Sequence, residues 1–558
     1  LSGLVGSEMC IRDSHGAAGA ATRTPRARLM SLVAMVPELF APGGVLARAD
    51  GHFQPRDGQT QMAVAVAQTI AEGGALVVEA GTGVGKTYAY LVPALLSGER
   101  VLLSTATKAL QDQLFARDLP RLVQILGLPV RMALLKGRAS YLCLHRMQQA
   151  RLDIQAQDRG VARVLAKVED WSRQTVSGDL AELTGLDERS PVIPLVTSTR
   201  ENCLGSSCPR FRECHVHRAR REALASDIVV INHHLFFADV AVRESGMAEL
   251  LPTVRVVVFD EAHQINETGV QFLGTQMSTG QWMDFARDLL IAGLQHARGL
   301  ADWAGLSQIL ELSARDLRLV VGNAIFLGAN GVAAGARVRW TEEAPEGLSD
   351  AAWHAALRAL GSACAQSLEA LDTVSEISPD LERLYERGSA LLARLARFSG
   401  PCQADAVRWL DVGNQLRLIE SPLDIADAMR ARILTLPAET SEGEAWPEDP
   451  VANVGRAWIF TSATLGADEA LTWFTERAGL KHARILRVAS PFDYARQAAL
   501  YVPRRLPSPA DPSHSRSVAE WVALAAEPLG GRTLVLTTTL KASVSYTHLR
   551  AHETREDL

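Results

Sequence analysis

Residues 75–87 read ALVVEAGTGVGKT, and this stretch decides the fold. Its first four residues are apolar and include two β-branched valines, which is typical of a short buried strand. A glycine-rich loop from Ala80 to Thr87 follows, and a helical pattern then runs through Leu96. A strand, a glycine-rich loop and a helix in this order form a phosphate-binding unit. The sequence therefore predicts a parallel sheet with a nucleotide site at its edge.

The residues of this loop match the chemistry that a nucleotide requires. Lys86 would reach the β- and γ-phosphates of ATP, and the Thr87 hydroxyl would ligate Mg²⁺. Ala80 stands where the general pattern has a glycine, so the tight turn is left to the glycines that follow. The alternative is a glycine-rich strand-to-helix turn without a ligand. Backbone N–H groups would close around the phosphates at Gly81, Thr82, Gly83, Val84 and Gly85.

The partner carboxylates are expected at the end of a second parallel strand. Residues 254–259 form a β-branched run, apolar except for one arginine, which stops at the string DEAH. Asp260 would hold Mg²⁺ through water, and Glu261 would polarise the attacking water. His263 would sense the γ-phosphate and couple it to DNA. A charged loop at the end of a strand is the structural alternative.

A third candidate for the nucleotide site lies upstream. Residues 53–59 read FQPRDGQ and precede a helix expected to begin near Thr60. Gln59 has both a donor and an acceptor, so its amide could meet the adenine edge. An ordinary polar helix start explains the same residue.

Four cysteines stand between the two halves of the predicted site. The intervening segments hold 59, 4 and 5 residues, without the CxxC pairs typical of structural zinc. Four thiolates suit a [4Fe-4S] cluster. Zinc held by three of them with His215 or His217, and unliganded core cysteines, remain alternatives. Cys364 and Cys402 are expected in the core. The candidate ligands are Cys143, Cys203, Cys208 and Cys214.

Composition limits the class of protein. A length of 558 residues with 47% hydrophobic side chains predicts several globular domains. No run is long and apolar enough for a membrane span, and no secretory signal stands at the start, so we expect a cytoplasmic protein. The net charge of −6 requires any DNA contact to be local. The arginines at 210, 212, 218, 220 and 221 could track a phosphate backbone or form an exposed helix face.

The two terminal segments do not resemble the sequence between them. Back-translation of residues 4–13 and 544–553 gives ten codons that pair as reverse complements. This DNA resembles a transposase-end sequencing adapter, so residues 1–14 and 544–558 are expected to be translated adapter. Met30 and Met35 are then candidate starts, and the gene is expected to run past Ser543.

The chain resembles the DinG/XPD-like superfamily 2 DNA helicases, most closely the proteobacterial YoaA branch, in its motifs and in their order along the sequence. The resemblance covers about residues 42 to 543. The strings that carry it are FQPRDGQTQMAVAV, EAGTGVGKTYAY, STATKALQDQL, LLKGRASYLC, CLGSSC, VVINHHLFFAD, VFDEAHQ, WIFTSATL and SPFDYARQ.

The resemblance implies an α/β fold, with a RecA-like parallel-sheet motor domain, inserted iron-sulfur and helical arch domains, and the start of a second RecA-like domain. Residues 104–113 would lie on the single-stranded DNA face, residues 232–234 would close the cysteine insertion onto it, and residues 461–464 would couple the two sites. The four cysteines would be cluster ligands in a wedge that splits the duplex.

The resemblance also implies a function and its partners. The protein would move 5′ to 3′ on single-stranded or forked DNA in repair or replication, as a monomer that uses ATP and Mg²⁺.

The expected domain order places tails at both ends and two insertions within the first motor domain. Residues 281–294 and 306–321 show helical spacing, so the text between His263 and Trp458 is expected to be helical. The predicted boundaries are a tail at 1–14, a leader at 15–49, motor domain 1 at 50–140, 219–275 and 441–466, the cysteine insertion at 141–218, the arch-like insertion at 276–440, an incomplete motor domain 2 at 467–543 and a tail at 544–558.

The second motor domain is expected to open with a strand at Thr533–Leu536 and to stop soon after. No QxxGRxxR string occurs in the sequence. Because an arginine finger can contribute roughly 10³ to 10⁵ in rate, we expect this polypeptide to bind ATP weakly and hardly hydrolyse it.

Two other functions fit parts of the sequence. One is a nucleotide-switched P-loop ATPase with structural zinc that unwinds nothing. The other is a nuclease, which the short text before Phe53 and its lack of an acidic triad disfavour.

Overall fold

The computed structural model describes residues 25–153, 159–187, 189–244, 251–327, 336–402, 406–422, 426–430, 455–509, 511–530 and 532–537. The chain divides into two compact units, with the boundary between Pro491 and Phe492. The predicted adapter tails, residues 1–14 and 544–558, lie outside the described residues. Within the described parts, we find no helix with both the length and the apolar character of a membrane span.

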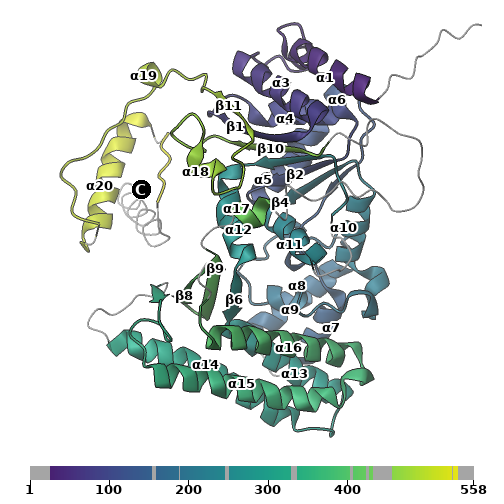
Figure 1. Ribbon diagram of the computed structural model, residues 1–558, viewed down its shortest axis with the longest axis vertical. Helices are drawn as coiled ribbons and strands as arrows, with labels where there is room; N and C mark the ends of the chain where they lie inside the picture. The colour runs from purple at the N-terminus through teal and green to yellow at the C-terminus, as the bar shows by residue number, and fades with distance from the viewer. Residues whose placement is uncertain are drawn as a thin grey trace, which may run out of the picture. The chain divides into compact units, whose positions relative to one another are not determined.

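A seven-stranded parallel sheet forms the centre of the first unit (Figure 1). Its strand order, β11-β1-β10-β5-β2-β4-β3, brings together segments that are far apart in the sequence. The strands are β1 (Gly74–Ala80), β2 (Val101–Thr105), β3 (Met132–Leu134), β4 (Ile228–Asn232), β5 (Val256–Asp260), β10 (Ala457–Ser462) and β11 (Arg484–Val488).

Helices cover both faces of this sheet. Leu76 and Val78 of β1 pack in one buried cluster, whereas Val77 points to the opposite one. This alternation is the reason why the central strands read as continuous apolar runs. The expected α/β class is confirmed. One face is covered by α1 (Pro25–Phe40), α2 (Val45–Ala49), α3 (Asp57–Glu72), α4 (Lys86–Ser97) and α6 (Leu119–Leu126), and the other by α10 (His215–Leu224), α11 (His233–Glu244), α12 (Ile265–Leu273) and α18 (Thr472–Thr475).

The cysteine insertion connects β3 to β4 and has its own small core. Leu142, Leu165, Val168 and Val192 are buried in it. Long stretches have no regular structure beyond single 3₁₀ turns, which is typical of a segment whose fold depends on a bound group. Its helices are α7 (Leu144–Asp153), α8 (Arg159–Ser172) and α9 (Ile193–Val196), and α10 follows.

The second insertion connects β5 to β10 and combines helices with a sheet. We expected helices alone, and this was wrong: a four-stranded antiparallel sheet, in the order β6-β9-β8-β7, packs with them. The elements are β6 (Thr275–Ser278), α13 (Thr279–His296), α14 (Trp303–Leu327), β7 (Ala336–Trp340), α15 (Asp350–Asp372), α16 (Pro379–Ser399), β8 (Ala406–Val412), β9 (Leu416–Pro422) and α17 (Ala426–Met429).

A buried ion pair is the reason why the sequence pattern did not predict this sheet. Arg408 and Glu420 face each other on neighbouring strands, 2.6 Å apart and almost wholly buried. Charged residues at core positions break the apolar alternation that identifies a strand. Cys402, expected in the core, is exposed beside β8, whereas Cys364 is buried as expected.

The start of the second motor domain also differs from expectation. We placed it at residue 467, but β11 pairs in parallel with β1 and belongs to the first sheet. A central β1, buried on both faces, gains a second neighbour in this way. The second unit contains α19 (Tyr494–Gln497) and α20 (His514–Ala526). The strand expected at Thr533–Leu536 is not formed, and it has no pairing partner among the described residues.

Candidate nucleotide site and cysteine cluster

The predicted nucleotide residues meet at one edge of the seven-stranded sheet. Glu79 of β1 lies beside Ser462 of β10, and Thr461 of β10 lies beside Asp260 of β5. Because these strands are parallel, their carboxyl ends open at the same edge. The structure therefore brings together the phosphate loop, the DEAH string and residues 461–464.

The phosphate loop has the backbone form that its glycines permit. Gly83 and Gly85 both have φ = 87°, in the left-handed region that glycine adopts without strain. Gly85 is the residue before α4, so the loop delivers its N–H groups to the helix N-terminus. The Lys86 ammonium donates to the Ala80 carbonyl at 3.4 Å, across the loop. The lysine is thus folded over the space that phosphates would fill.

Within the described residues, Asp260 is hydrogen-bonded to a side chain through one of its two carboxylate oxygens. The Tyr90 hydroxyl donates to its Oδ2 at 3.2 Å, whereas Oδ1 has no hydrogen-bond partner among the described residues. Burial, followed by the charge of Glu261, raises the pKa of Asp260 to about 6, and the Lys86 charge opposes this shift. The ionised form of a buried carboxyl group with a raised pKa is stabilised when a cation binds to it.

Glu261, His263 and Ser462 form a triangle beside Asp260. The Ser462 hydroxyl lies 2.9 Å from Nδ1 of His263 and donates to Oε2 of Glu261 at 3.3 Å. The same Glu261 oxygen lies 3.4 Å from the His263 ring. Glu261 has φ = 54°, an uncommon left-handed value for a residue other than glycine, and such strain is a feature of functional sites.

Gln59 contacts the phosphate loop rather than open space. It is buried, and its Nε2 donates to the Gly85 carbonyl at 2.9 Å. Oε1 has no partner within the described residues. The amide oxygen and the second Nε2 hydrogen are the groups that could meet adenine, and this contact stays a prediction.

His233 is hydrogen-bonded to β2 and packs against the strand that ends at Asp260. Its Nδ1 lies 2.7 Å from the Ser104 hydroxyl, at the start of the segment expected on the DNA face. Burial lowers the pKa of His233 to about 4, although the backbone of Glu261 and Asp260 opposes the shift. The ring is therefore neutral at neutral pH, and it packs against Phe259 of β5 while Nε2 has no hydrogen-bond partner among the described residues.

The four candidate ligand cysteines lie in one neighbourhood and are all free thiols. Burial, and further the charges of Cys203, Cys208 and Cys214, raise the pKa of Cys143 to about 11. Thiolates that lie near one another repel. Binding of a metal in place of the thiol protons stabilises the thiolate form. Within the described residues, however, no three His, Cys, Asp or Glu side chains approach closely enough to hold a single metal ion.

The two histidines of the zinc alternative each have one neighbouring side chain that contacts the ring. Nδ1 of His215 lies 3.2 Å from the Arg218 guanidinium, and the ring packs on Gly178, where a Cβ would come within 2.2 Å of it. His217 packs against the ring of Phe211, with centroids 4.2 Å apart. Nε2 of His215 is buried without a hydrogen-bond partner among the described residues, so the zinc alternative keeps a histidine nitrogen near the cysteines.

The arginines near the cysteines divide into paired and buried ones. Arg210 pairs with Glu213 at 2.5 Å, and Arg218 lies 3.9 Å from Glu222. Burial and the charge of Arg138 lower the pKa of Arg220 to about 10. A guanidinium in this position is a better candidate for an anionic backbone than the paired surface arginines.

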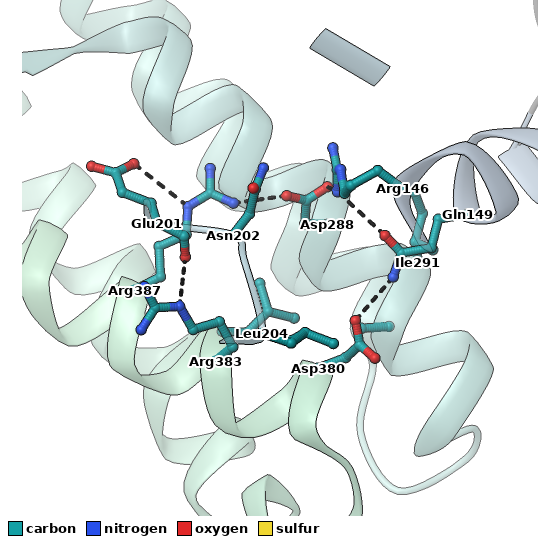
Figure 2. A pocket seen from close by; sticks show the side chains of 12 residues that line it. Arg146, Gln149, Glu201, Asn202, Leu204, Asp288, Ile291, Asp380, Arg383 and Arg387 are labelled. Atoms are coloured by element: carbon teal, nitrogen blue, oxygen red, sulfur yellow. Dashed lines mark hydrogen bonds and ion pairs between the residues drawn. The ribbon is translucent and has the colours of Figure 1, made fainter. Parts of the chain in front are cut away.

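The two insertions meet through a polar pocket, shown in Figure 2. One carboxylate oxygen of Asp288 on α13 pairs with the guanidinium of Arg146 on α7, and the other pairs with that of Arg387 on α16. Both N–O distances are 2.7 Å. Asp380 lies 2.9 Å from His145 and accepts from Gln149 at 3.0 Å. This pocket joins the cysteine insertion to the helical one through charges that are already paired.

Sequence reasoning missed three residues of the nucleotide edge. Tyr90 lies one helical turn beyond Thr87 on α4, so the spacing could have placed it on the same face. Glu79 and Arg487 form an ion pair at 2.8 Å, but 408 positions separate them, and no local pattern joins them.

Comparison with known proteins gives the same class. A family model described as DEAD/DEAH box helicase matches residues 60–165. The chain is 38% identical over 507 residues to the ATP-dependent DNA helicase YoaA of Escherichia coli (strain K12), covering 89% of this chain and 74% of that protein. It is 37% identical to the protein of that name from Haemophilus influenzae, covering 90% and 74%. A solved structure of S. tokodaii Xpd4 aligns over 89% of this chain and 73% of its own, with 13% identity and a TM-score of 0.42.

Proposed function

The chain belongs to the YoaA branch of the DinG-like helicases, and we propose that it is the motor of an ATP-dependent DNA helicase that moves along single-stranded DNA. The observation that carries this proposal is the convergence at one sheet edge. There Lys86 begins α4, and Asp260, which Tyr90 of the same helix contacts, is followed by Glu261 and His263.

The protein groups have separate tasks in this proposal. Lys86 and the loop N–H groups hold the phosphates, and Gln59 supports the loop from behind through Gly85. Asp260 and Thr87 would hold Mg²⁺, which supplies positive charge to the phosphoryl oxygens when bound. Glu261, oriented by Ser462, would accept a proton from the attacking water.

Contact between the nucleotide and DNA regions would run through Ser462, which joins residues 461–464 to Glu261 and His263 by hydrogen bonds. His233 is hydrogen-bonded to Ser104, and its ring packs against Phe259, the residue before Asp260. A shift of the carboxylates on nucleotide binding would therefore act on residues 461–464 through hydrogen bonds and on His233 through packing.

We further propose that the four cysteines hold a [4Fe-4S] cluster. The four side chains are all free thiols, and burial, together with the charges of the other three cysteines, raises the pKa of Cys143 to about 11. Their number matches the four thiolates that such a cluster requires. When bound, the cluster would fix the fold of the segments around the cysteines.

The nucleotide proposal is tested by equilibrium binding of a fluorescent ATP analogue with Mg²⁺. Lys86→Ala should weaken binding by about 100-fold, because a charge facing phosphates is lost. Lys481→Ala, at an exposed lysine that pairs with Glu476, is the matched control and should bind as the wild type does. Equal affinity of the Lys86 variant would refute the site. Strand displacement on forked DNA by the completed parent protein then separates a helicase from a nucleotide-switched ATPase.

The cluster proposal is tested by metal content and colour. The purified chain should carry iron and sulfide in equal amounts and absorb visible light, and Cys208→Ser should lose both. Cys364→Ser is the control, since this thiol is buried in the helical insertion. One zinc per chain in colourless protein would instead support the alternative.

A further inference from the structure

The chain passes over the phosphate loop as it leaves the seven-stranded sheet. β11 is the last strand of this sheet in sequence, and it lies directly beside β1. Residues 488–490, here termed the exit segment, begin with the last residue of β11 and contact the loop. The second unit begins two residues later, at Phe492.

Two hydrogen bonds attach the exit segment to the loop. The Gly81 N–H donates to the Val488 carbonyl at 3.0 Å. The Ser490 hydroxyl donates to the Thr82 carbonyl at 2.7 Å. These partners belong to the loop that is expected to surround the phosphates, so the exit segment touches the nucleotide-binding backbone itself.

Packing at the exit segment excludes side chains at two glycines. A Cβ on Gly81 would lie 2.7 Å from the Ser490 nitrogen, a backbone atom. A Cβ on Gly58 would lie 2.4 Å from Cγ1 of Val488. The absence of a side chain at both glycines therefore allows the exit segment to pack closely. Neither glycine has a positive φ, so backbone conformation does not account for the need for glycine at these positions.

Glu79 fixes the same region with four hydrogen bonds. One carboxylate oxygen accepts from the backbone N–H groups of Leu465 at 2.6 Å and Gly466 at 3.1 Å. The other accepts from Nη2 of Arg487 at 2.8 Å and from its Nε at 3.1 Å. Arg487 also donates to the Asp468 carbonyl at 3.2 Å. The carboxylate thus joins three segments: the strand before the phosphate loop, the turn after residues 461–464, and β11.

We propose that Glu79 and Arg487 are positioning residues that couple the phosphate loop to the exit segment, so that nucleotide in the loop restrains residues 465–468 and 486–491. This inference rests on the proposed nucleotide site. The contacts transmit a change in loop position directly, because each end of the coupling is a hydrogen bond to the loop or to the strand that precedes it.

β11 carries a natural control for this proposal. Arg484 and Arg487 lie on the same strand with side chains that are 42% and 41% exposed. Arg484 donates to Thr69 and to the Ala65 carbonyl of α3, away from the loop. Loss of either arginine removes a similar amount of surface bonding, but only Arg487 reaches Glu79.

The experiment is hydrogen exchange of the full chain, with and without Mg²⁺ and a non-hydrolysable ATP analogue. In the wild type, the analogue should slow exchange in peptides covering 465–468 and 486–491. Arg487→Gln and Glu79→Gln should bind the analogue within about fivefold of the wild type but lose most of this protection. The glutamine still offers an oxygen to Leu465 and Gly466, so the turn should keep its fold. Arg484→Gln should keep the protection.

Each result decides between separate claims. Full protection in the Arg487 and Glu79 variants, or equal loss in the Arg484 variant, would overturn the coupling. A wild-type chain that does not bind the analogue would instead overturn the nucleotide site. Ser490→Ala is a second route, since it removes only the hydroxyl contact with Thr82 and should reduce protection partly.

Discussion

Two partly buried aspartates show how differently the nucleotide edge and the contact between the insertions use charge. Burial raises the pKa of Asp260 to about 6, and one of its oxygens has no partner among the described residues. Burial acts in the same direction on Asp380, but hydrogen bonding and charge from His145, and the charge of His296, bring its pKa below the usual value. Among the described residues, the first carboxylate lacks a hydrogen-bond partner on one oxygen, whereas the second lies within hydrogen-bond distance of His145 and Gln149. A raised pKa with a free oxygen therefore indicates a ligand site, whereas a lowered pKa indicates structural pairing.

The largest effect that would sharpen this comparison is expected for Asp260→Asn. Binding of the ATP analogue should lose its dependence on Mg²⁺, with affinity reduced by about 100-fold. Without ligand, the variant should be more stable than the wild type at pH 8, by on the order of 3 kcal/mol, because the folded carboxylate titrates well above its unfolded value.

The sign of this stability change can be checked by urea unfolding. Since the pKa is raised on folding, the destabilisation is present at pH 8 and should disappear as the pH falls through about 6 toward 3.8. A variant that is less stable than the wild type at pH 8 would break the comparison.

The next effect is expected for Arg387→Met at the contact between the insertions. The arginine side chain is 4% exposed, and its loss leaves one Asp288 oxygen unpaired. The free energy of unfolding should drop by about 3 kcal/mol. Binding of the ATP analogue should be unchanged. Arg315→Met, at an exposed arginine on α14, serves as the control and should cost less than about 1 kcal/mol.

The smallest effect is expected for Asp380→Asn, and it depends on pH. The variant should lose about 2 kcal/mol of stability, because hydrogen bonds to a charged carboxylate are replaced by weaker ones. Since the folded pKa is lowered, this contribution is full above about 3.8 and is lost as the pH falls through the folded value.

Urea unfolding of Asp380→Asn and wild type from pH 7 to pH 3 measures this difference. The two curves should run parallel above pH 4 and approach each other below it. A gap that widens below pH 4, where the carboxylate takes up its proton, would show that Asp380 is not stabilised as a charged group.

The sequence predicted much of the first sheet because its signals are local. Residues 75–87 gave strand, loop and helix within 13 positions, and residues 254–263 gave a strand end with two carboxylates. β1, α4 and β5 lie where these patterns put them. The antiparallel sheet of the second insertion was missed because Arg408 and Glu420 occupy core positions as a buried pair. The place of β11 was missed because parallel pairing joins strands without a local turn.

By itself, the sequence determined the class of the protein and the identity of its chemical groups: a phosphate loop, a DEAH string and four cysteines in a fixed order. Only the tertiary structure decided which groups have partners. It gave Asp260 a tyrosine on one oxygen and none of the described residues on the other, and it brought Glu79 to Arg487 across 408 positions. Spacing along a chain specifies local geometry, but hydrogen bonding and desolvation depend on neighbours that folding supplies from distant segments.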